Sequence, residues 1–190
     1  MCRKQQTGRC LGGTVIYLET ERLILRDYCV DDFEEYFRLK SDPETMRYLE
    51  GSRPVSRVAA HAEFQKVLAD QNGPNRKFTF LHMACRDSHE TVGSIGYSVV
   101  DATPLGKIVD AGYFSFPQFW GKGYTTEAFR CVIDYAFRED LVWEIIATCF
   151  AENVGSQRVM QKCGMTKTKE YSAMLDGAEK RKLEYRLVRK

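Results

Sequence analysis

The sequence predicts a mixed α/β fold, in which helices flank a mostly antiparallel sheet. First, three consecutive runs rich in β-branched and aromatic residues are separated by turns of hairpin length. Second, a later segment has apolar residues at the i, i+3, i+4 spacing of an amphipathic helix. Third, strand-like runs precede and follow that segment, which gives one strand–helix–strand crossover. From the number of such runs we expect about seven strands.

The composition fits one domain with one core, since 44% of the 190 residues are hydrophobic. The 28 basic and 26 acidic residues give a formal net charge of +2, too small for a global field that would attract nucleic acid or an anionic membrane. No apolar stretch approaches the length of a membrane span. Seven scattered cysteines without a C-x-x-C pair are typical of a reducing compartment. We therefore expect a cytoplasmic protein with no metal site, no nucleic-acid partner and no membrane partner.

The first half of the chain reads as a strand followed by three helices. Residues 1–14 show no periodicity, and we expect a disordered leader outside the fold. Alternating apolar and polar side chains over 17–28 predict the first strand. Asp31 is the expected cap of a short helix, and the capping, proline and glycine signals of "SDPETMRYLEG" (41–51) predict a second one. A third helix is expected over 56–71.

The second half contains the strands of the hairpin pattern and the crossover. The helix of the crossover begins after Gly123 and ends near Arg138. A second helix follows the next strand, with Gly164 just past its end. The predicted strands of this half are 77–85, 91–101, 107–116, 142–150, 165–175 and 180–190.

The stretch "QFWGKGYTTEA" (118–128) places two glycines between a strand and a helix. A helix start leaves about four N–H groups without intrahelical partners, and these attract an anion. Gly121 and Gly123 would let a phosphate approach that backbone. Two known phosphate loops do not fit, because Lys122 is not followed by Ser or Thr and Thr126 stands where a third glycine is required. The alternative is a tight turn without a ligand.

Four segments, in the right order, resemble one enzyme family. Gln118, Gly121 and Gly123 match Q/R-x-x-G-x-G/A, the pyrophosphate-binding motif of the GNAT acyl-CoA N-acyltransferases. "AENVGSQRVMQKCGM" is similar to the N-x-x-S and K-C-G-F/M segment of the branch that includes the ribosomal-protein alanine N-acetyltransferases. "LETERLILRDY" and "SDPETMRYLEG" resemble the first strand and second helix of that branch. The resemblance runs from about 17 to 190.

This resemblance implies a single acetyltransferase domain over 15–190, whose two central strands splay apart around acetyl-CoA, the acetyl donor. The pyrophosphate would bind the N–H groups of the glycine turn, and the strand Tyr113 to Phe116 would bind the pantetheine arm. A backbone N–H near Phe114 would stabilise the oxyanion. The implied donor-binding residues are Phe114, Ser115, Phe116, Gln118, Gly121, Lys122, Gly123, Tyr124, Thr125 and Asn153.

Two residues are candidates for the proton transfers of direct acyl transfer to an amine. Asp110 stands where related sequences often carry Glu, and its carboxylate would accept the amine proton directly or through water. The alternative is a solvated strand-end acid. Ser156 occupies the Ser of N-x-x-S, a position assigned as general acid in related enzymes, or is an ordinary first-turn serine. Asn153 would hold the pantetheine amide, cap the helix, or both.

The acceptor is a primary amine, on a protein N-terminus or a small molecule. An α-amino group has a pKa near 8, against about 10.4 for lysine, so it requires less help from a base. The segments expected to bind the acceptor, 28–60 and 170–180, contain no motif that identifies it. We expect a monomer or a homodimer. The alternative function is a non-catalytic acyl-CoA-binding or regulatory module, which keeps the loop but lacks a competent base.

Overall fold

The computed structural model describes residues 3–4, 15–49, 53–73 and 75–190. Within these residues one sheet has the strand order β1-β2-β3-β4-β5-β6-β7-β9-β8. Its neighbours are antiparallel except β6 and β7, which are parallel. The elements are β1 (Arg3–Lys4), β2 (Tyr17–Glu19), β3 (Leu23–Arg26), α1 (Phe33–Ser41), α2 (Arg57–Gln71), β4 (Phe78–Cys85), β5 (Thr91–Thr103), β6 (Gly106–Ser115), α3 (Tyr124–Arg138), β7 (Val142–Phe150), α4 (Val154–Lys162), β8 (Thr166–Leu175) and β9 (Ala178–Val188).

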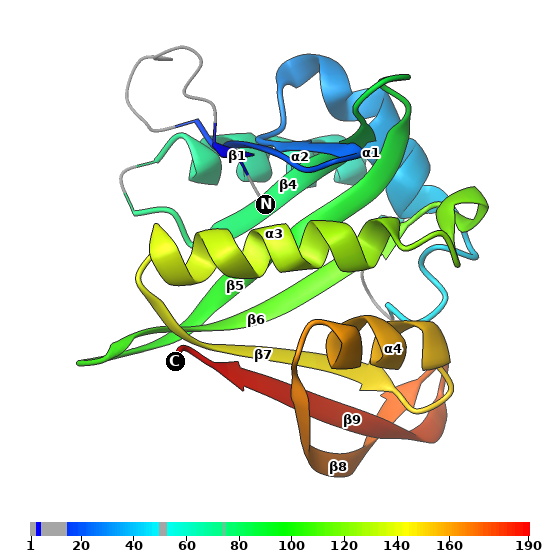
Figure 1. The fold of residues 1–190 in the computed structure, drawn as a ribbon. Coiled ribbons are helices and arrows are strands. Elements are labelled where there is room, and N and C mark those ends of the chain that lie inside the picture. Colours follow the sequence, from blue (N-terminus) through cyan, green and yellow to red (C-terminus); the bar gives the residue numbers. More distant parts are fainter. Residues whose placement is uncertain (1–2, 5–14, 50–52, 74) are drawn as a thin grey trace.

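Helices cover both faces of this sheet, as Figure 1 shows: α3 and α4 lie on one face, α1 and α2 on the other. The buried side chains of α3, among them Ala128, Phe129 and Val132, join those of the strands in the main core. A second cluster, with Tyr28, Tyr36 and Phe64, fills the space beneath α1 and α2. The predicted class is confirmed, a mixed fold with a mostly antiparallel sheet, because periodicity along α3 and alternation along the strands were strong signals.

The predicted strand over 17–28 is wrong in one respect, since it forms a tight β2–β3 hairpin. Thr20 N–H donates to the Leu23 carbonyl, and Leu23 N–H donates to the Thr20 hydroxyl, both at 2.9 Å. These two bonds close a turn between β2 and β3. The alternation of apolar and polar side chains could not reveal this turn, because it continues through both strands. Arg3–Lys4 adds a further strand beside β2, whereas the rest of the expected leader 1–14 lies outside the described residues.

The predicted helix over 41–51 is also wrong, since 43–48 forms successive turns. The Asp42 carboxylate does accept the N–H of Thr45 at 2.7 Å, as a helix cap would. One bond of the α-helical type follows, from Met46 N–H to the Asp42 carbonyl at 3.1 Å, but the next two span only three residues, from Arg47 N–H to the Glu44 carbonyl and from Leu49 N–H to the Met46 carbonyl. Residues 50 and 51 lie outside the described part of the chain. Thr45 and Met46 are buried, so tertiary packing outweighs the local helix signals.

The expected cap of the preceding helix shifts by one residue. Asp31 lies inside a short 3₁₀ turn and is exposed. Asp32 accepts the N–H of Cys29 at 2.7 Å and both terminal nitrogens of Arg26 at 2.6 and 2.8 Å. The pKa of Asp32 falls to about 2: burial acts to raise it, but these hydrogen bonds outweigh that effect. Asp32 immediately precedes α1, but its side chain closes the 3₁₀ turn and makes no capping hydrogen bond to the helix.

The two central strands pair over only part of their length. The parallel register of β6 and β7 begins at Lys107 with Val142 and ends at Ala111 with Ala147. Beyond this point β6 continues to Ser115 and stays paired with β5, while β7 stays paired with β9. The two strands diverge toward the start of α3 in Figure 1. This divergence is the splay that the resemblance implied.

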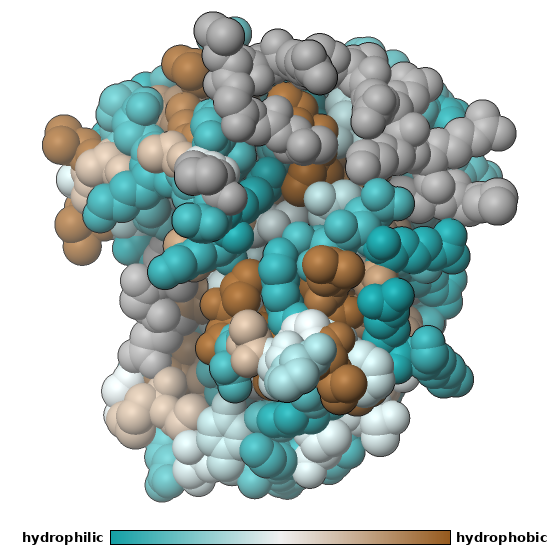
Figure 2. Space-filling view, turned by 90° about the vertical axis from the view of Figure 1, so that its left-hand side faces the viewer, coloured by the Kyte–Doolittle hydropathy of each residue, from teal (hydrophilic) through white to brown (hydrophobic). Residues whose placement is uncertain are grey.

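Apolar surface lies at the other end of β6 and β7. Leu105, Leu141 and Val188 are each more than two-fifths exposed there, at 63%, 68% and 43%. Their segments are adjacent, because Lys107 N–H donates to the Leu141 carbonyl and Arg189 N–H to that of Trp143. Figure 2 shows this side with hydrophobic areas among hydrophilic ones. No helix in the described residues is long and apolar enough to cross a membrane.

Candidate active site

The glycine turn adopts a backbone that favours glycine at two positions. Gly121 has φ of +73° and Gly123 has φ of +83°, both in the left-handed region. A Cβ at Gly121 would meet nothing within 4 Å, and one at Gly123 would meet only the Arg22 guanidinium at 3.5 Å. The two glycines are therefore required by backbone conformation rather than by lack of space. Gly123 is the N-cap of α3.

Six consecutive backbone N–H groups at this turn have no acceptor among the described residues. They belong to residues 121–126, and the first bond of α3 runs from Glu127 N–H to the Gly123 carbonyl at 3.0 Å. The N–H groups of a helix start are oriented along the helix axis, where the dipole favours negative charge. The turn thus presents an unusually large set of donors to an anion. Because residues 121–123 are exposed, these donors are open to an anion or, in a ligand-free turn, to water.

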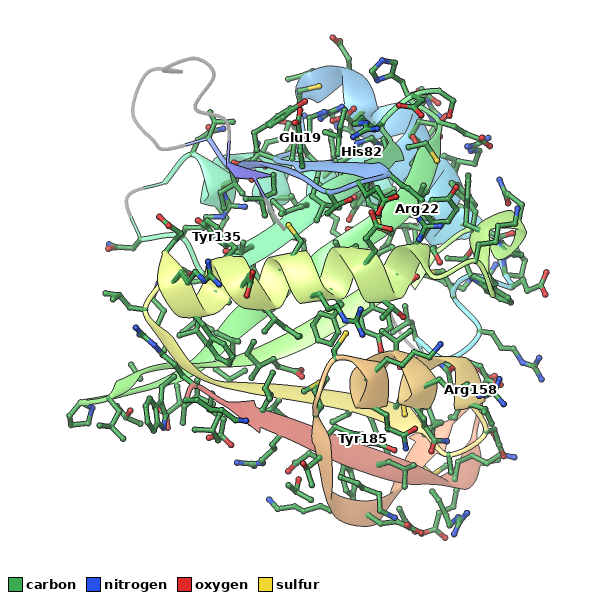
Figure 3. The ribbon with its side chains drawn as sticks, in the orientation of Figure 1. Glu19, Arg22, His82, Tyr135, Arg158 and Tyr185 are labelled. Atoms are coloured by element: carbon green, nitrogen blue, oxygen red, sulfur yellow. The ribbon has the colours of Figure 1, made fainter. Side chains whose placement is uncertain are left out.

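Arg22 and Glu127 fasten this turn to the β2–β3 hairpin. Arg22 donates from Nε to Glu127 Oε2 at 2.7 Å, and its Nη1 donates to the Lys122 carbonyl at 3.0 Å. Thr20 donates to Glu127 Oε1 at 2.6 Å. The Arg22 guanidinium also lies 4.4 Å from the centre of the Tyr124 ring. Figure 3 places Arg22 beside the first turn of α3. Glu127 therefore links the helix start to the hairpin.

The remaining predicted loop residues are placed around this turn. Lys122 is exposed, and no side-chain partner for it is found in the described part of the chain. Gln118 is exposed in the short 3₁₀ turn Pro117–Phe119. The Thr125 hydroxyl lies 3.5 Å from that of Ser115, which links the helix start to the end of β6. Trp120 donates its indole N–H to the Ser115 carbonyl at 2.8 Å, a second link of the same kind.

The N–H of Phe114, expected near the oxyanion, faces β5 and not the diverging strands. Phe116 N–H donates to the Val92 carbonyl of the β5 side at 3.0 Å. Because N–H directions alternate along an antiparallel strand, Phe114 also faces β5. The residues between, Tyr113 and Ser115, direct their N–H groups to the opposite side, toward the diverging β7. The Ser115 carbonyl points the same way, since it accepts from Trp120. Backbone donors for a ligand between the strands are therefore Tyr113 and Ser115.

Asp110 lies one residue before the β6–β7 pairing ends, opposite Ile146. Its side chain is exposed, yet its pKa is raised above the usual range, chiefly by desolvation. Lys182 opposes this shift with its positive charge, and Glu184 adds to it. An exposed carboxylate with a raised pKa fits a concave surface where protein restricts hydration without covering the group. Asp110 stays a candidate for the base.

Ser156 is hydrogen-bonded to a tyrosine of β6. The Tyr113 hydroxyl lies 2.9 Å from Ser156 Oγ and donates to the Ser156 carbonyl at 3.1 Å. Burial raises the pKa of Tyr113, so this hydroxyl stays protonated at neutral pH. The Ser156 N–H in turn donates to Asn153 Oδ1 at 3.1 Å, which makes Asn153 the N-cap of α4. Tyr113 thus joins β6 to α4 beside the diverging strands.

The candidate base and the candidate acid lie on opposite faces of the sheet. Tyr113 packs against Phe129 of α3, with ring centres 5.2 Å apart. Phe114 lies on the other face, with Nζ of Lys40 in α1 5.9 Å from its ring centre. Side chains alternate along a strand, so Asp110 shares the face of Phe114. An acyl group between β6 and β7 would have Asp110 on one side and the Tyr113–Ser156 pair on the other.

The signal for Tyr113 was weak in the sequence, because an aromatic residue in a strand usually belongs to the core. For Arg22 the sequence carried no usable signal, because its partner Glu127 is 105 residues away. Burial raises the pKa of Cys149, next to this site, to about 11, so its thiol stays protonated at neutral pH.

Comparison with known proteins gives the same picture. The family model of the acetyltransferase (GNAT) domain matches residues 22–166. The uncharacterized N-acetyltransferase YnaD of Bacillus subtilis (strain 168) is 30% identical over 152 residues, 79% of this chain and 82% of YnaD. Ribosomal-protein-S5-alanine acetyltransferase from Vibrio fischeri has a TM-score of 0.78 at 19% identity, with 91% of this chain and 96% of that chain covered. Spermidine N-acetyltransferase from Vibrio cholerae, in complex with CoA and spermine, has a TM-score of 0.76 at 13% identity, with 89% and 96% covered.

A splayed sheet with an anion-binding turn at its open end defines an acyl-CoA-dependent transferase. The chain belongs to the GNAT family of acetyltransferases. It is an N-acetyltransferase that uses acetyl-CoA as its donor.

Proposed function

We propose that this enzyme transfers the acetyl group directly from acetyl-CoA to a primary amine while both substrates are bound. The observation that carries this proposal is the row of six unpaired N–H groups at 121–126, at the open end of strands that diverge after Ala111. This row would bind the pyrophosphate, and the diverging strands would admit the pantetheine arm. The acetyl group would then lie where candidate acid and base flank it from opposite faces.

Two backbone donors would polarise the thioester. The N–H groups of Tyr113 and Ser115 face the diverging strands and are fixed by the β5–β6 ladder on their other side. A donor held in advance at the oxygen of a tetrahedral intermediate contributes about 3 kcal/mol to transition-state stabilisation. The acetyl carbonyl oxygen would accept from one of them as the amine nitrogen attacks.

The protons would follow a defined route. The amine nitrogen forms a bond to the acetyl carbon and loses a proton to Asp110, directly or through water. The raised pKa of Asp110 makes it a better base than an ordinary aspartate. When the carbon–sulfur bond breaks, the departing thiolate takes a proton from Ser156, and the Tyr113 hydroxyl orients Ser156 and can replace that proton. The products are the acetylated amine and CoA thiol.

The acceptor would reach the site from the Asp110 face. The solved relatives include an enzyme named for a ribosomal-protein alanine and one bound to spermine, so the fold accommodates a protein N-terminus and a small amine alike. We propose these two acceptor classes for this enzyme. Its cytoplasmic location and its state as monomer or homodimer remain predictions.

The test is a screen of the wild type with acetyl-CoA against N-terminal peptides, polyamines, amino acids and aminoglycosides, with release of CoA thiol as the readout. We expect turnover with one class of amine.

Replacing Ser156 with Ala should lower kcat about a hundredfold, the typical contribution of general acid catalysis. Tyr113→Phe should lower it about tenfold, because Ser156 keeps its hydroxyl but loses its orienting partner.

Tyr17→Phe is the matched control, because the Tyr17 hydroxyl donates to Glu19 on β2, far from the diverging strands. Unchanged turnover in Ser156→Ala would refute the assignment of Ser156. Saturable CoA binding without turnover of any amine would favour the acyl-CoA-binding module instead.

A further inference from the structure

We propose that Arg22 is a positioning residue of the donor site, which together with Glu127 holds the glycine turn in its anion-binding conformation. The inference rests on the proposed binding of the CoA pyrophosphate at residues 121–126. It assigns a function in donor binding to the β2–β3 hairpin, which contains none of the predicted site residues.

The contacts of Arg22 are too numerous for a surface ion pair. Its backbone N–H donates to Glu127 Oε1 at 2.9 Å, and its side chain makes a two-point contact with Oε2 through Nε and Nη2, both at 2.7 Å. The same guanidinium reaches the Lys122 carbonyl and lies over the Tyr124 ring. One side chain therefore contacts both the turn and the first helical turn. Bidentate geometry of this kind fixes orientation as well as position.

The bond to the Lys122 carbonyl determines where the next N–H points. This carbonyl and the N–H of Gly123 belong to one planar trans peptide group and point in opposite directions. Because the carbonyl faces Arg22, the Gly123 N–H faces away from it, in the row of unpaired donors. Without Arg22 this peptide group, which joins Lys122 to a glycine with positive φ, could rotate. Its carbonyl would then face the phosphate and repel it.

Arg22 also compensates the negative charge of Glu127. A carboxylate in the first turn of α3 lies close to a bound pyrophosphate, where an uncompensated negative charge would weaken binding. Burial acts to raise the pKa of Glu127, but hydrogen bonds from Thr20 and Arg22, together with the charge of Arg22, lower it overall. Glu127 is therefore ionised, and its charge is compensated by Arg22. The pair is neutral and serves as a rigid support.

A direct role of Arg22 as a phosphate ligand predicts a different result for its partner. If Arg22 bound phosphate itself, removing the charge of Glu127 would release the guanidinium and would leave CoA affinity unchanged or increase it. If Arg22 positions the turn, the same change loosens the support and weakens binding. The variant Glu127→Gln therefore separates the two roles.

The experiment measures CoA binding by calorimetry and acetyl-CoA kinetics for the full chain and its variants. We expect Arg22→Gln and Glu127→Gln each to raise Kd for CoA and KM for acetyl-CoA about tenfold, the usual effect of losing a charge-assisted hydrogen bond. The kcat at saturating acetyl-CoA should change less than about threefold, since the acid and base are untouched. Arg22→Lys should give an intermediate Kd, because it keeps the charge but not the two-point contact.

Arg138→Gln is the matched control, since Arg138 forms an exposed ion pair with Asp134 at the other end of α3. The double variant Arg22→Gln/Glu127→Gln should bind no more weakly than either single variant, as expected for two halves of one support. Unchanged affinity in folded Arg22→Gln, or unchanged or tighter binding in Glu127→Gln, would overturn the inference. If Arg22→Gln does not fold, the Kd values of Arg22→Lys and Glu127→Gln for CoA test the inference instead. Failure of the wild type to bind CoA would instead refute the proposed function.

Discussion

At the scale of single residues, Asp110 combines exposure with a raised pKa, and the sign of its effect on stability can be derived. Folding raises the pKa of this carboxyl above its value in the unfolded chain. The group therefore contributes stability below the unfolded pKa, and this contribution is lost as pH rises through the folded pKa. At neutral pH the ionised carboxylate slightly destabilises the enzyme. This is the pattern expected of a group retained for chemistry rather than for stability.

We predict that Asp110→Asn lowers kcat about a hundredfold at pH 8 and removes the loss of activity at low pH that titration of the base produces in the wild type. The same change should leave the melting temperature at pH 7 equal or slightly higher, because an unfavourable charge is removed. Thiol release across pH and thermal unfolding provide the measurements. Asp87→Asn, on a 90% exposed side chain, is the control. An acid limb that persists in Asp110→Asn would assign the base to another group.

Local sequence spacing revealed the residues whose roles depend on near neighbours. Gly121 and Gly123 were predictable because their conformation is set within one turn. The N–H of Phe114 proved to face β5 because N–H direction depends on the partner strand, which spacing within β6 does not reveal. Arg22 and Tyr113 act through partners on distant elements, and only the folded chain brings these together.

At the scale of elements, the effect of the turn before α3 on CoA binding can be measured separately from the loss of stability that replacing a glycine causes. Gly123→Ala should lower the free energy of unfolding by about 1 kcal/mol, because alanine is strained at positive φ. It should also raise Kd for CoA at least about tenfold, since the turn would shift and misdirect its N–H groups. Denaturant unfolding and calorimetry measure the two effects.

The control for that prediction is Gly164→Ala at the end of α4. Gly164 has φ of +84° and nothing within 4 Å of its Cβ position, so the strain should be similar. The stability of Gly164→Ala should fall as much as that of Gly123→Ala, while its affinity for CoA should equal that of the wild type. Equal loss of affinity in both variants would mean that destabilisation, and not turn geometry, weakens binding.

Helices and strands could be predicted from the sequence where one local pattern was stronger than the others. The periodicity of α3 and the hairpin turns between β4, β5 and β6 gave correct elements. The segment 41–51 carried good helix signals, yet burial of Thr45 and Met46 and the hydrogen bond of Thr45 to the Ser115 carbonyl favour turns over the end of β6. Local propensity is a weak prior where tertiary contacts compete with it.

At the scale of the whole molecule, the sheet consists of two parts that share a short seam. Strands β1 to β6 form one part, and β7, β9 and β8 form the other. In the described part of the chain, strand pairing joins them only over the register from Lys107 to Ala111, and Tyr113 with Ser156 adds a link on the face of α3 and α4. A ligand between the diverging strands would therefore contact both parts. Its binding should stabilise the chain as a unit.

We predict that CoA at about a hundredfold excess over its Kd stabilises the fold by about 2.7 kcal/mol, which raises the melting temperature by about 5 to 10 °C. In amide exchange, the N–H groups that face the diverging strands should gain protection, namely Tyr113 and Ser115 on β6 and Thr148 and Phe150 on β7. Phe114 should not change, because its N–H already faces β5. ATP, which carries phosphates but no pantetheine arm, should protect residues 121–126 alone. If ATP protected the N–H groups of β6 and β7 as strongly as CoA does, the pantetheine arm would not be what shields them. The protection would then come from closure of the two parts of the sheet.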